Sequence, residues 1–128
     1  MSFSFLSLNV RGLGNTEKRK QVFQWLKNQN NTFYYLQETH SSSNSKQYWE
    51  TEWGHTCFFS GKSSNSEGIA ILVNHNFSKT KVGKHTEIIP GRLQSLEVSI
   101  EDKSFVFINV YGPDNDNQTL FDKLHAYL

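Results

Sequence analysis

Residues 33–40, FYYLQETH, decide how the rest of the sequence is interpreted. The stretch begins with aromatic and aliphatic side chains, which is typical of a buried β-strand. It then ends on four polar residues: Gln37, Glu38, Thr39 and His40. An ionised carboxylate at the end of a buried strand is costly unless water or a cation compensates its charge. The stretch therefore raises the hypothesis that Glu38 binds a cation.

The residues before this stretch complete a strand–helix–strand unit. FSFLSLNV at 3–10 predicts a strand, and an apolar period of 3.6 residues predicts a helix from Thr16, its expected N-cap, to about residue 29. A crossover of this length favours two parallel strands. We expect four basic side chains to lie mostly on the solvent side of the helix, where nucleic-acid contact is the less favoured alternative. They are Lys18, Arg19, Lys20 and Lys27.

The remaining sequence predicts a mixed sheet flanked by helices, which is the α/β class. A short helix is expected near 47–53, followed by strands at 55–60, 68–74, 81–89, 93–100 and 104–112 and a last helix at 117–127. PGR and EDK separate the last three strands as hairpin turns. The strands at 68–74 and 104–112 are apolar throughout, which indicates burial on both faces. We expect the helices at 17–29 and 117–127 to cover one face, and a second layer to be missing.

Composition sets the general class of protein. The chain has 128 residues, of which 36% are hydrophobic and 14% aromatic, as expected for one folded domain. A net charge of +1 gives no overall field for a polyanionic partner. Cys57 is the single cysteine, which excludes an intramolecular disulfide and favours an intracellular location, nuclear or cytoplasmic, over secretion. No apolar stretch is long enough to cross a membrane.

Three apolar strands end on polar side chains: Asn9, Glu38 and Tyr111. If these strands run parallel, the three side chains emerge at one edge of the sheet, where ligands bind in α/β folds. Hard oxygen ligands suit Mg²⁺ better than Zn²⁺. The alternatives are that Glu38 caps its strand in solvent or pairs with Arg11 or a lysine, that Tyr111 packs at a turn, and that Asn9 forms a turn.

Other kinds of site find little support in the sequence. His40 lies two residues from Glu38, but the other histidines are scattered, which disfavours a zinc site. Cys57 lies inside an apolar strand, where a thiol is normally unreactive. Neither a nucleophilic serine motif nor a phosphate-binding glycine loop occurs.

Four motifs in this order resemble a known superfamily: LNVRGL, LQETH, GIAILVN and FINVYGP. The sequence is similar to the N-terminal half of the endonuclease/exonuclease/phosphatase superfamily, and within it to the apurinic/apyrimidinic-type endonuclease domain of LINE-type non-LTR retrotransposons. The resemblance implies a DNase I-like four-layer α/β sandwich. It also implies that residues 1–128 form one partial domain, which ends before the second half of the fold and lacks its second sheet.

The resemblance also implies an activity, which is hydrolysis of DNA phosphodiesters with Mg²⁺, or Mn²⁺, to nick a target site. By this resemblance Glu38 is the metal-binding carboxylate, Asn9 lies beside the metal and the phosphate, and Tyr111 contacts the scissile phosphate. Arg11 stands where related repair enzymes carry an aspartate; it can hold a phosphate but cannot bind Mg²⁺. The resemblance implies DNA as the partner. Separately, the apolar sheet face that the pattern leaves uncovered offers a surface for a homodimer, and no membrane partner is expected.

The sequence departs from the superfamily in its C-terminal motifs. The Asp-x-Asn pair, a later aspartate and a closing Asp-His have no match, because the chain's four aspartates lie in other contexts. They are Asp102, Asp114, Asp116 and Asp122. We therefore expect weak metal binding and weak or no cleavage by this chain. The alternatives are a non-catalytic half-domain that self-associates or binds nucleic acid, and a superfamily hydrolase that acts on phosphoinositides, sphingomyelin or RNA tails, which LQETH disfavours.

Overall fold

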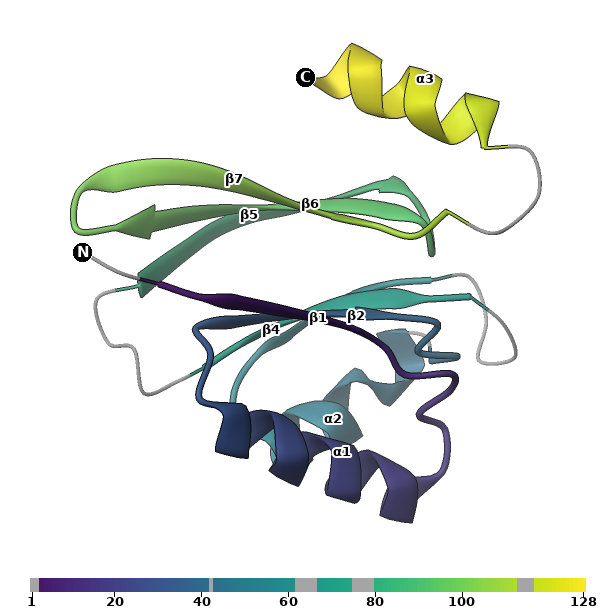
Figure 1. Ribbon diagram of the computed structural model, residues 1–128, viewed down its shortest axis with the longest axis vertical. Helices are drawn as coiled ribbons and strands as arrows, with labels where there is room; N and C mark the ends of the chain where they lie inside the picture. The colour runs from purple at the N-terminus through teal and green to yellow at the C-terminus, as the bar shows by residue number, and fades with distance from the viewer. Residues whose placement is uncertain (1–2, 42, 62–66, 75–79, 113–116) are drawn as a thin grey trace.

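The protein forms a four-layer sandwich in which helices cover the outer faces of two stacked sheets (Figure 1). The structure is a computed structural model that describes residues 3–41, 43–61, 67–74, 80–112 and 117–128. Its elements are β1 (Phe5–Asn9), α1 (Thr16–Gln29), β2 (Phe33–Gln37), η1 (Ser43–Ser45), α2 (Lys46–Trp53), β3 (Cys57–Ser60), β4 (Ile69–Val73), β5 (Thr80–Ile89), β6 (Leu93–Ile100), β7 (Lys103–Val110) and α3 (Gln118–Tyr127).

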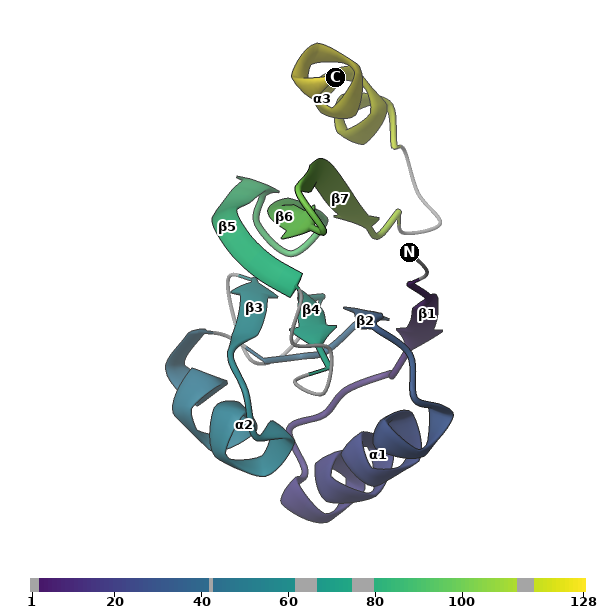
Figure 2. The same cartoon turned by 90° about the vertical axis from the view of Figure 1, so that its left-hand side faces the viewer.

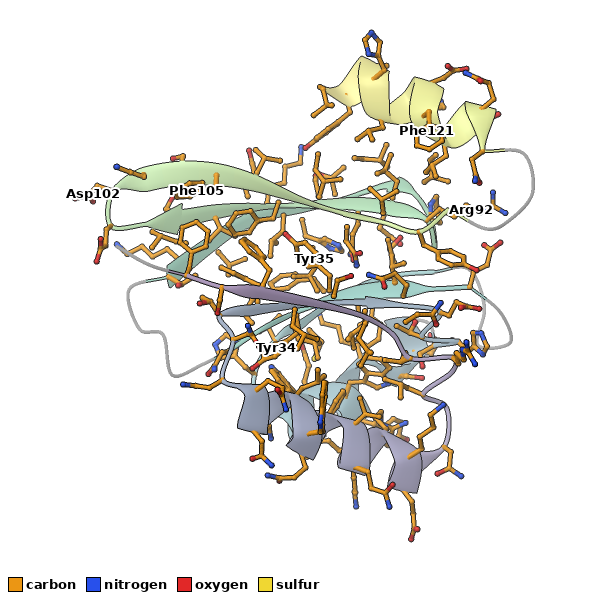
Figure 3. The ribbon with its side chains drawn as sticks, viewed as in Figure 1. Tyr34, Tyr35, Arg92, Asp102, Phe105 and Phe121 are labelled. Atoms are coloured by element: carbon orange, nitrogen blue, oxygen red, sulfur yellow. The ribbon has the colours of Figure 1, made fainter. Side chains whose placement is uncertain are left out.

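The first sheet has the strand order β1-β2-β4-β3. β1 and β2 are parallel, with Phe5 opposite Phe33 and Asn9 opposite Gln37, as the strand–helix–strand pattern predicts. β4 runs antiparallel to both of its neighbours. Side chains along β2 alternate between the layers, so that Tyr34 points toward the helices and Tyr35 toward the second sheet (Figure 3).

The second sheet, in the order β5-β6-β7, is antiparallel throughout. The α/β sandwich class is confirmed, but the expectation of a missing second sheet is wrong. The two predicted hairpin turns fold these three strands back on one another, and the sheet they form covers the inner face of the first sheet. The expected place of the last helix is also wrong, because α3 lies over the second sheet while α1 and α2 cover the first (Figure 1).

Two hydrophobic clusters hold the layers together. The first lies between the first sheet and α1 and α2, and includes the buried rings of Phe23, Tyr34, Trp49 and Trp53. The second lies between the two sheets and is rich in phenylalanine. Aromatic rings there pack edge to face, for example Phe33 on Phe107 with 4.7 Å between ring centroids. Among the described residues, no helix is long and apolar enough to cross a membrane.

A relay of side-chain amides crosses between the two sheets. Gln37 Nε2 donates to Asn109 Oδ1 at 3.1 Å, and Asn109 Nδ2 donates to Gln94 Oε1 at 3.0 Å. Gln94 Nε2 donates to the carbonyl oxygen of Phe58 and lies 2.8 Å from His85 Nε2. Buried polar groups need such partners, and a satisfied network specifies one arrangement of the layers. The relay therefore aligns β7 with β2.

His85, at the end of this relay, makes stability depend on pH. Gln94 donates to its Nε2, so the imidazole is neutral in the folded protein. Burial lowers the pKa of His85, the charge of Lys46 lowers it further, and Glu87 acts in the opposite direction. The unfolded chain binds this proton near pH 6.5 and the folded protein binds it only at lower pH. Stability is thus complete above about pH 6.5 and is lost as the pH falls below it.

We expect the free energy of unfolding to decrease by up to about 1.4 kcal/mol per pH unit just below pH 6.5. The measurement is urea unfolding at several pH values, followed by tryptophan fluorescence. His85→Gln should remove this slope, whereas His125→Gln, at an exposed position of α3, should keep it. An unchanged slope in His85→Gln would contradict the assignment.

Candidate metal- and phosphate-binding site

Asn9 and Glu38 meet at the carboxyl ends of the two parallel strands. Asn9 is the last residue of β1, and Glu38 directly follows β2. Asn9 Nδ2 donates a hydrogen bond to Glu38 Oε2, and Asn9 Oδ1 accepts one from the backbone N–H of Arg11 at 3.1 Å. The structure thus brings these two residues together. Within the described residues Glu38 forms no salt bridge, so the structure gives it an amide partner in place of Arg11 or a lysine.

Two loops fix the position of Glu38 through the backbone. The N–H of Gly12 donates to the carbonyl oxygen of Glu38 at 2.6 Å, and the N–H of Leu13 donates to that of Thr39 at 2.8 Å. From the other side, Thr39 and His40 donate to the carbonyl oxygens of Gly68 and Glu67, at 3.0 and 2.8 Å. Glu38 is therefore held on a rigid base between the loop after β1 and the segment before β4.

Backbone strain concentrates in these loops. Four residues have φ between 50 and 57°, a left-handed backbone conformation that residues other than glycine rarely adopt: Arg11, Glu38, His40 and Glu67. Each such residue costs about 1–3 kcal/mol and persists where its surroundings impose it, most often at functional sites. Gly68 also has positive φ, and a Cβ there would lie 2.5 Å from Thr39 Oγ1. Close packing thus supports the strained path of the chain around Glu38.

Arg92 and Tyr111 lie at the same end of the sandwich, on the second sheet. Arg92 Nη2 forms a salt bridge with Glu67 Oε1 at 2.8 Å, and Glu67 is the residue that binds the backbone of His40. The N–H of Tyr111 donates to the carbonyl oxygen of Arg92 at 2.8 Å. Arg92 and Asp102 mark opposite ends of this sheet in Figure 3. Tyr111 is therefore placed on the side of Glu38 through Arg92, although β7 belongs to the second sheet and not to the sheet of β1 and β2.

No sequence pattern predicts a role for Glu67 or Arg92 in this site. Arg92 belongs to PGR, which predicts a turn, and Glu67 stands before the GIAILVN strand. The one available signal is the charge of Arg92 inside a hairpin turn, and this signal does not predict that Glu67 is its partner.

The basic residues of α1 stabilise the fold more than the sequence predicts. Lys18 Nζ donates to the carbonyl oxygens of Val10 and Arg11, at 2.9 and 3.1 Å. Arg19 is buried, which corrects the prediction that it faces solvent: it bonds Glu52 on α2 and the carbonyl oxygen of Leu13. The N-cap is Asn15 and not Thr16, because Asn15 Oδ1 accepts from the N–H of Lys18 at 2.9 Å.

The rival sites gain no support from the geometry. Among the described residues, no group of three or more His, Cys, Asp and Glu side chains is placed to share a metal ion. Cys57 is buried, and burial raises the pKa of its thiol, as expected of an unreactive cysteine. Asp102 lies in the hairpin turn between β6 and β7, and Asp122 on α3 accepts from Gln118. Asp114 and Asp116 lie outside the described residues.

Comparison with known proteins identifies the family. The family model described as endonuclease/exonuclease/phosphatase matches residues 6–125. The chain belongs to this family. It is also 31% identical over 130 residues to the transposon TX1 uncharacterized 149 kDa protein of Xenopus laevis, and it spans only 10% of that protein's length. The membership in the endonuclease/exonuclease/phosphatase family expected from LNVRGL and LQETH is thus confirmed.

Solved structures of similar proteins confirm the DNase I-like fold class. An AP endonuclease from Archaeoglobus fulgidus matches 99% of the chain with a TM-score of 0.72 and 19% identity. A truncated Caenorhabditis elegans TDP2 matches 98% with a TM-score of 0.70 and 23% identity. The endonuclease domain of TRAS1, a telomere-specific non-LTR retrotransposon, matches 98% with a TM-score of 0.63 and 6% identity. The chain spans 51–55% of these solved chains.

The residues at this end of the sandwich fit part of an Mg²⁺ site. Glu38 offers a half-buried carboxylate, the type of hard oxygen ligand that Mg²⁺ prefers, and Asn9 orients it. Mg²⁺ commonly uses only one or two carboxylates, with water and substrate phosphates as its other ligands. A donor set with one carboxylate therefore fits Mg²⁺ bound together with a phosphate, and fits Zn²⁺ poorly.

Proposed function

We propose that the chain carries part of the active site of an Mg²⁺-dependent DNA endonuclease that nicks a retrotransposon target site. Glu38 holds the metal, which Mn²⁺ can replace, and a DNA phosphodiester lies between Glu38 and Tyr111. The observation that supports the proposal is the side-chain contact of Asn9 with Glu38 at the ends of two parallel strands. Family membership supports phosphodiester chemistry.

Each residue has a separate role in this proposal. The carboxylate of Glu38 binds the metal, and the amide of Asn9 keeps it facing the cleaved phosphate. Glu38 would hold the Mg²⁺, and the bound ion would supply positive charge to neutralise the phosphoryl oxygens. Arg11, exposed and anchored to Asn9 through its backbone, binds a neighbouring phosphate. The phenol of Tyr111 donates to a phosphate oxygen.

The described residues leave parts of this chemistry without an assigned group. Glu38 is the carboxylate of the site, and we assign no general base to activate water. Such a base is commonly worth 10²-fold or more in rate. We therefore propose that the isolated chain binds the metal weakly and cleaves slowly.

Nicking of supercoiled plasmid tests the proposal. In Mg²⁺ at high protein concentration, we expect slow conversion to the open-circular form, reduced about 100-fold in Glu38→Gln because an amide replaces the charged ligand. Glu97→Gln, an exposed carboxylate on β6, is the matched control and should nick like the wild type. Equal nicking by wild type and Glu38→Gln would contradict the proposal.

Binding of nucleic acid without cleavage is the second candidate function. The observation that favours it is the exposed guanidinium of Arg11, whose backbone N–H is held by Asn9 beside Glu38. If wild type does not nick, fluorescence anisotropy with a labelled DNA duplex separates the two functions. Under the second function we expect salt-dependent binding that Arg11→Ala weakens and Glu38→Gln leaves intact.

A further inference from the structure

We propose that His85 is an acid-sensitive switch for the candidate site. Its neutral imidazole completes the amide relay between the two sheets, and a proton on that imidazole loosens the relay and with it the position of Tyr111 relative to Glu38. Control of cleavage by this switch rests on the proposed function, whereas the switch itself does not. The relay and the second sheet occupy the sheet face that the sequence pattern leaves uncovered, so that face is not open to a second copy of the chain.

Each amide of the relay stands close to a residue of the site. Gln37 directly precedes Glu38 at the end of β2. On the second sheet Gln94 and Asn109 lie opposite each other, and each is two residues from a residue of the site. Those two residues are Arg92 and Tyr111. A change in the relay therefore reaches both sheets at the end where the site lies.

Backbone carbonyl groups fix the direction of the relay. Gln94 Nε2 donates to the carbonyl oxygen of Phe58 at 3.1 Å, and Asn109 Nδ2 donates to that of Ala70 at 3.0 Å. A carbonyl oxygen only accepts, so each side-chain nitrogen must face its carbonyl group and each side-chain oxygen must face the other way. His85 Nε2 lies 2.8 Å from Gln94 Nε2 and is therefore the accepting nitrogen of a neutral imidazole.

A β-bulge turns His85 into the space between the sheets. Val82 pairs with Val98 and His85 pairs with Leu96, so β5 has one residue more than β6 over this interval. Without the extra residue, the alternation of side chains would turn Lys84 inward and His85 outward. Bulges re-aim side chains in this way and occur often beside functional sites. The backbone of β5 thus places a titratable ring at the end of the relay.

A proton on His85 is incompatible with this relay. It makes Nε2 a donor that faces the donating nitrogen of Gln94. A turn of the Gln94 amide would break its bond to Phe58 and set its nitrogen against Asn109 Nδ2, which its own carbonyl partners hold in place. The imidazolium must therefore leave the relay or displace Gln94. Either response loosens Gln94, which links the second sheet to Phe58 in the first sheet.

The surroundings of His85 keep the imidazole neutral until the pH falls. Burial lowers the pKa of His85, Lys46 on α2 lowers it further, and Glu87 on β5 raises it. β5 lies over β3 at one side of the sandwich (Figure 2), and β3 and β6 face the ring with the uncharged side chains of Phe58 and Gln94. The relay is therefore intact above about pH 6.5 and loosens as the pH falls below that value through the lowered pKa.

The test is a pH titration of the wild type by nuclear magnetic resonance. The signals to follow are those of the His85 ring nitrogens, the side-chain amides of Gln94 and Asn109, and the backbone amide of Tyr111. We expect all of them to shift with one midpoint, below about pH 6.5. The side-chain amide of Asn28, which is exposed on α1 and accepts from Gln24, is the control and should not shift.

Three variants connect these shifts to His85. Lys46→Met, at a side chain that is 48% exposed, removes a cation that lowers the pKa of His85. The midpoints of His85, of the relay amides and of Tyr111 should then move together to higher pH. Lys123→Met, exposed on α3, is the matched control and should leave these midpoints unchanged. His85→Gln should abolish the shifts of the relay amides and of Tyr111.

Relay amides that stay unshifted while His85 titrates, or that shift equally in His85→Gln, would overturn the proposal. Midpoints that Lys46→Met does not move, or a His85 that binds no proton before the protein unfolds, would overturn it as well. If His85→Gln does not fold, the comparison with Lys46→Met decides, because that change lies on the surface. The titration contains neither metal nor DNA, so failure here leaves the proposed function untouched.

Discussion

Replacing Arg19 by alanine is expected to lower the free energy of unfolding by about 3–5 kcal/mol, because it leaves a partly buried carboxylate without its cation. The Arg19 side chain is 8% exposed and that of Glu52 is 14% exposed. Two parallel bonds join them, from Nε to Oε2 at 2.5 Å and from Nη2 to Oε1 at 2.7 Å. A third bond, to the carbonyl oxygen of Leu13, ties both helices to the loop that follows β1.

Urea unfolding followed by tryptophan fluorescence measures this loss, with Lys20→Ala, an exposed neighbour, as the control. The hydrogen bond from Arg19 lowers the pKa of Glu52 below its usual 4.5. The stabilisation is therefore present above about pH 4.5 and is lost as the pH falls through the lowered pKa. The difference between wild type and Arg19→Ala should shrink in this acidic range. A loss under 1 kcal/mol at pH 7 would contradict the account of this ion pair.

Replacing Asn109 by alanine is expected to cost about 3–4 kcal/mol, because several buried polar groups lose their partner together. Asn109 is 1% exposed. Its Nδ2 reaches the carbonyl oxygens of Leu36 and Ala70 and the side chain of Gln94, and its Oδ1 accepts from Gln37. The matched control is Asn28→Ala, since Asn28 is exposed on α1 and its side chain bonds only that of Gln24 within the described residues.

The same substitution tests how the two sheets are aligned. Asn109 stands two residues before Tyr111, so loss of the relay should also loosen the position of Tyr111 relative to Glu38. We expect Asn109→Ala to lose stability and nicking together. Retained stability in Asn109→Ala would show that aromatic packing alone aligns the sheets.

Local patterns predicted the elements well, because each element carries its own signal. The apolar period of α1, the parallel pairing of β1 with β2, and the turns PGR and EDK all follow from residues close in sequence. The layer that each element joins could not be predicted in this way. Burial on both faces of 68–74 shows that a covering layer exists, but it does not show which strands supply it.

The residues of the site also fall into two groups, those that local patterns predict and those that depend on tertiary contacts. Asn9 and Glu38 were predictable together, because parallel strands bring their carboxyl ends to one edge. The contact of Glu67 with Arg92 joins two loops that are 25 residues apart, and no periodic pattern in the sequence predicts this contact. The pattern of α1 predicts that Arg19 faces solvent. Its burial could not be predicted from that pattern, because it depends on Glu52, which lies on another helix. Left-handed backbone at Glu38 and His40 likewise follows from tertiary contacts and not from residue type.

Titration with Mn²⁺, followed by electron paramagnetic resonance of the free ion, tests the central assignment of Glu38 as a metal ligand. It needs no cleavage, so a slow or inactive chain can still be measured. We predict one saturable Mn²⁺ site per chain in the wild type and in Glu97→Gln, displaced by excess Mg²⁺ and lost in Glu38→Gln. Mn²⁺ binding of equal strength in wild type and Glu38→Gln, or none in the wild type, would contradict the assignment.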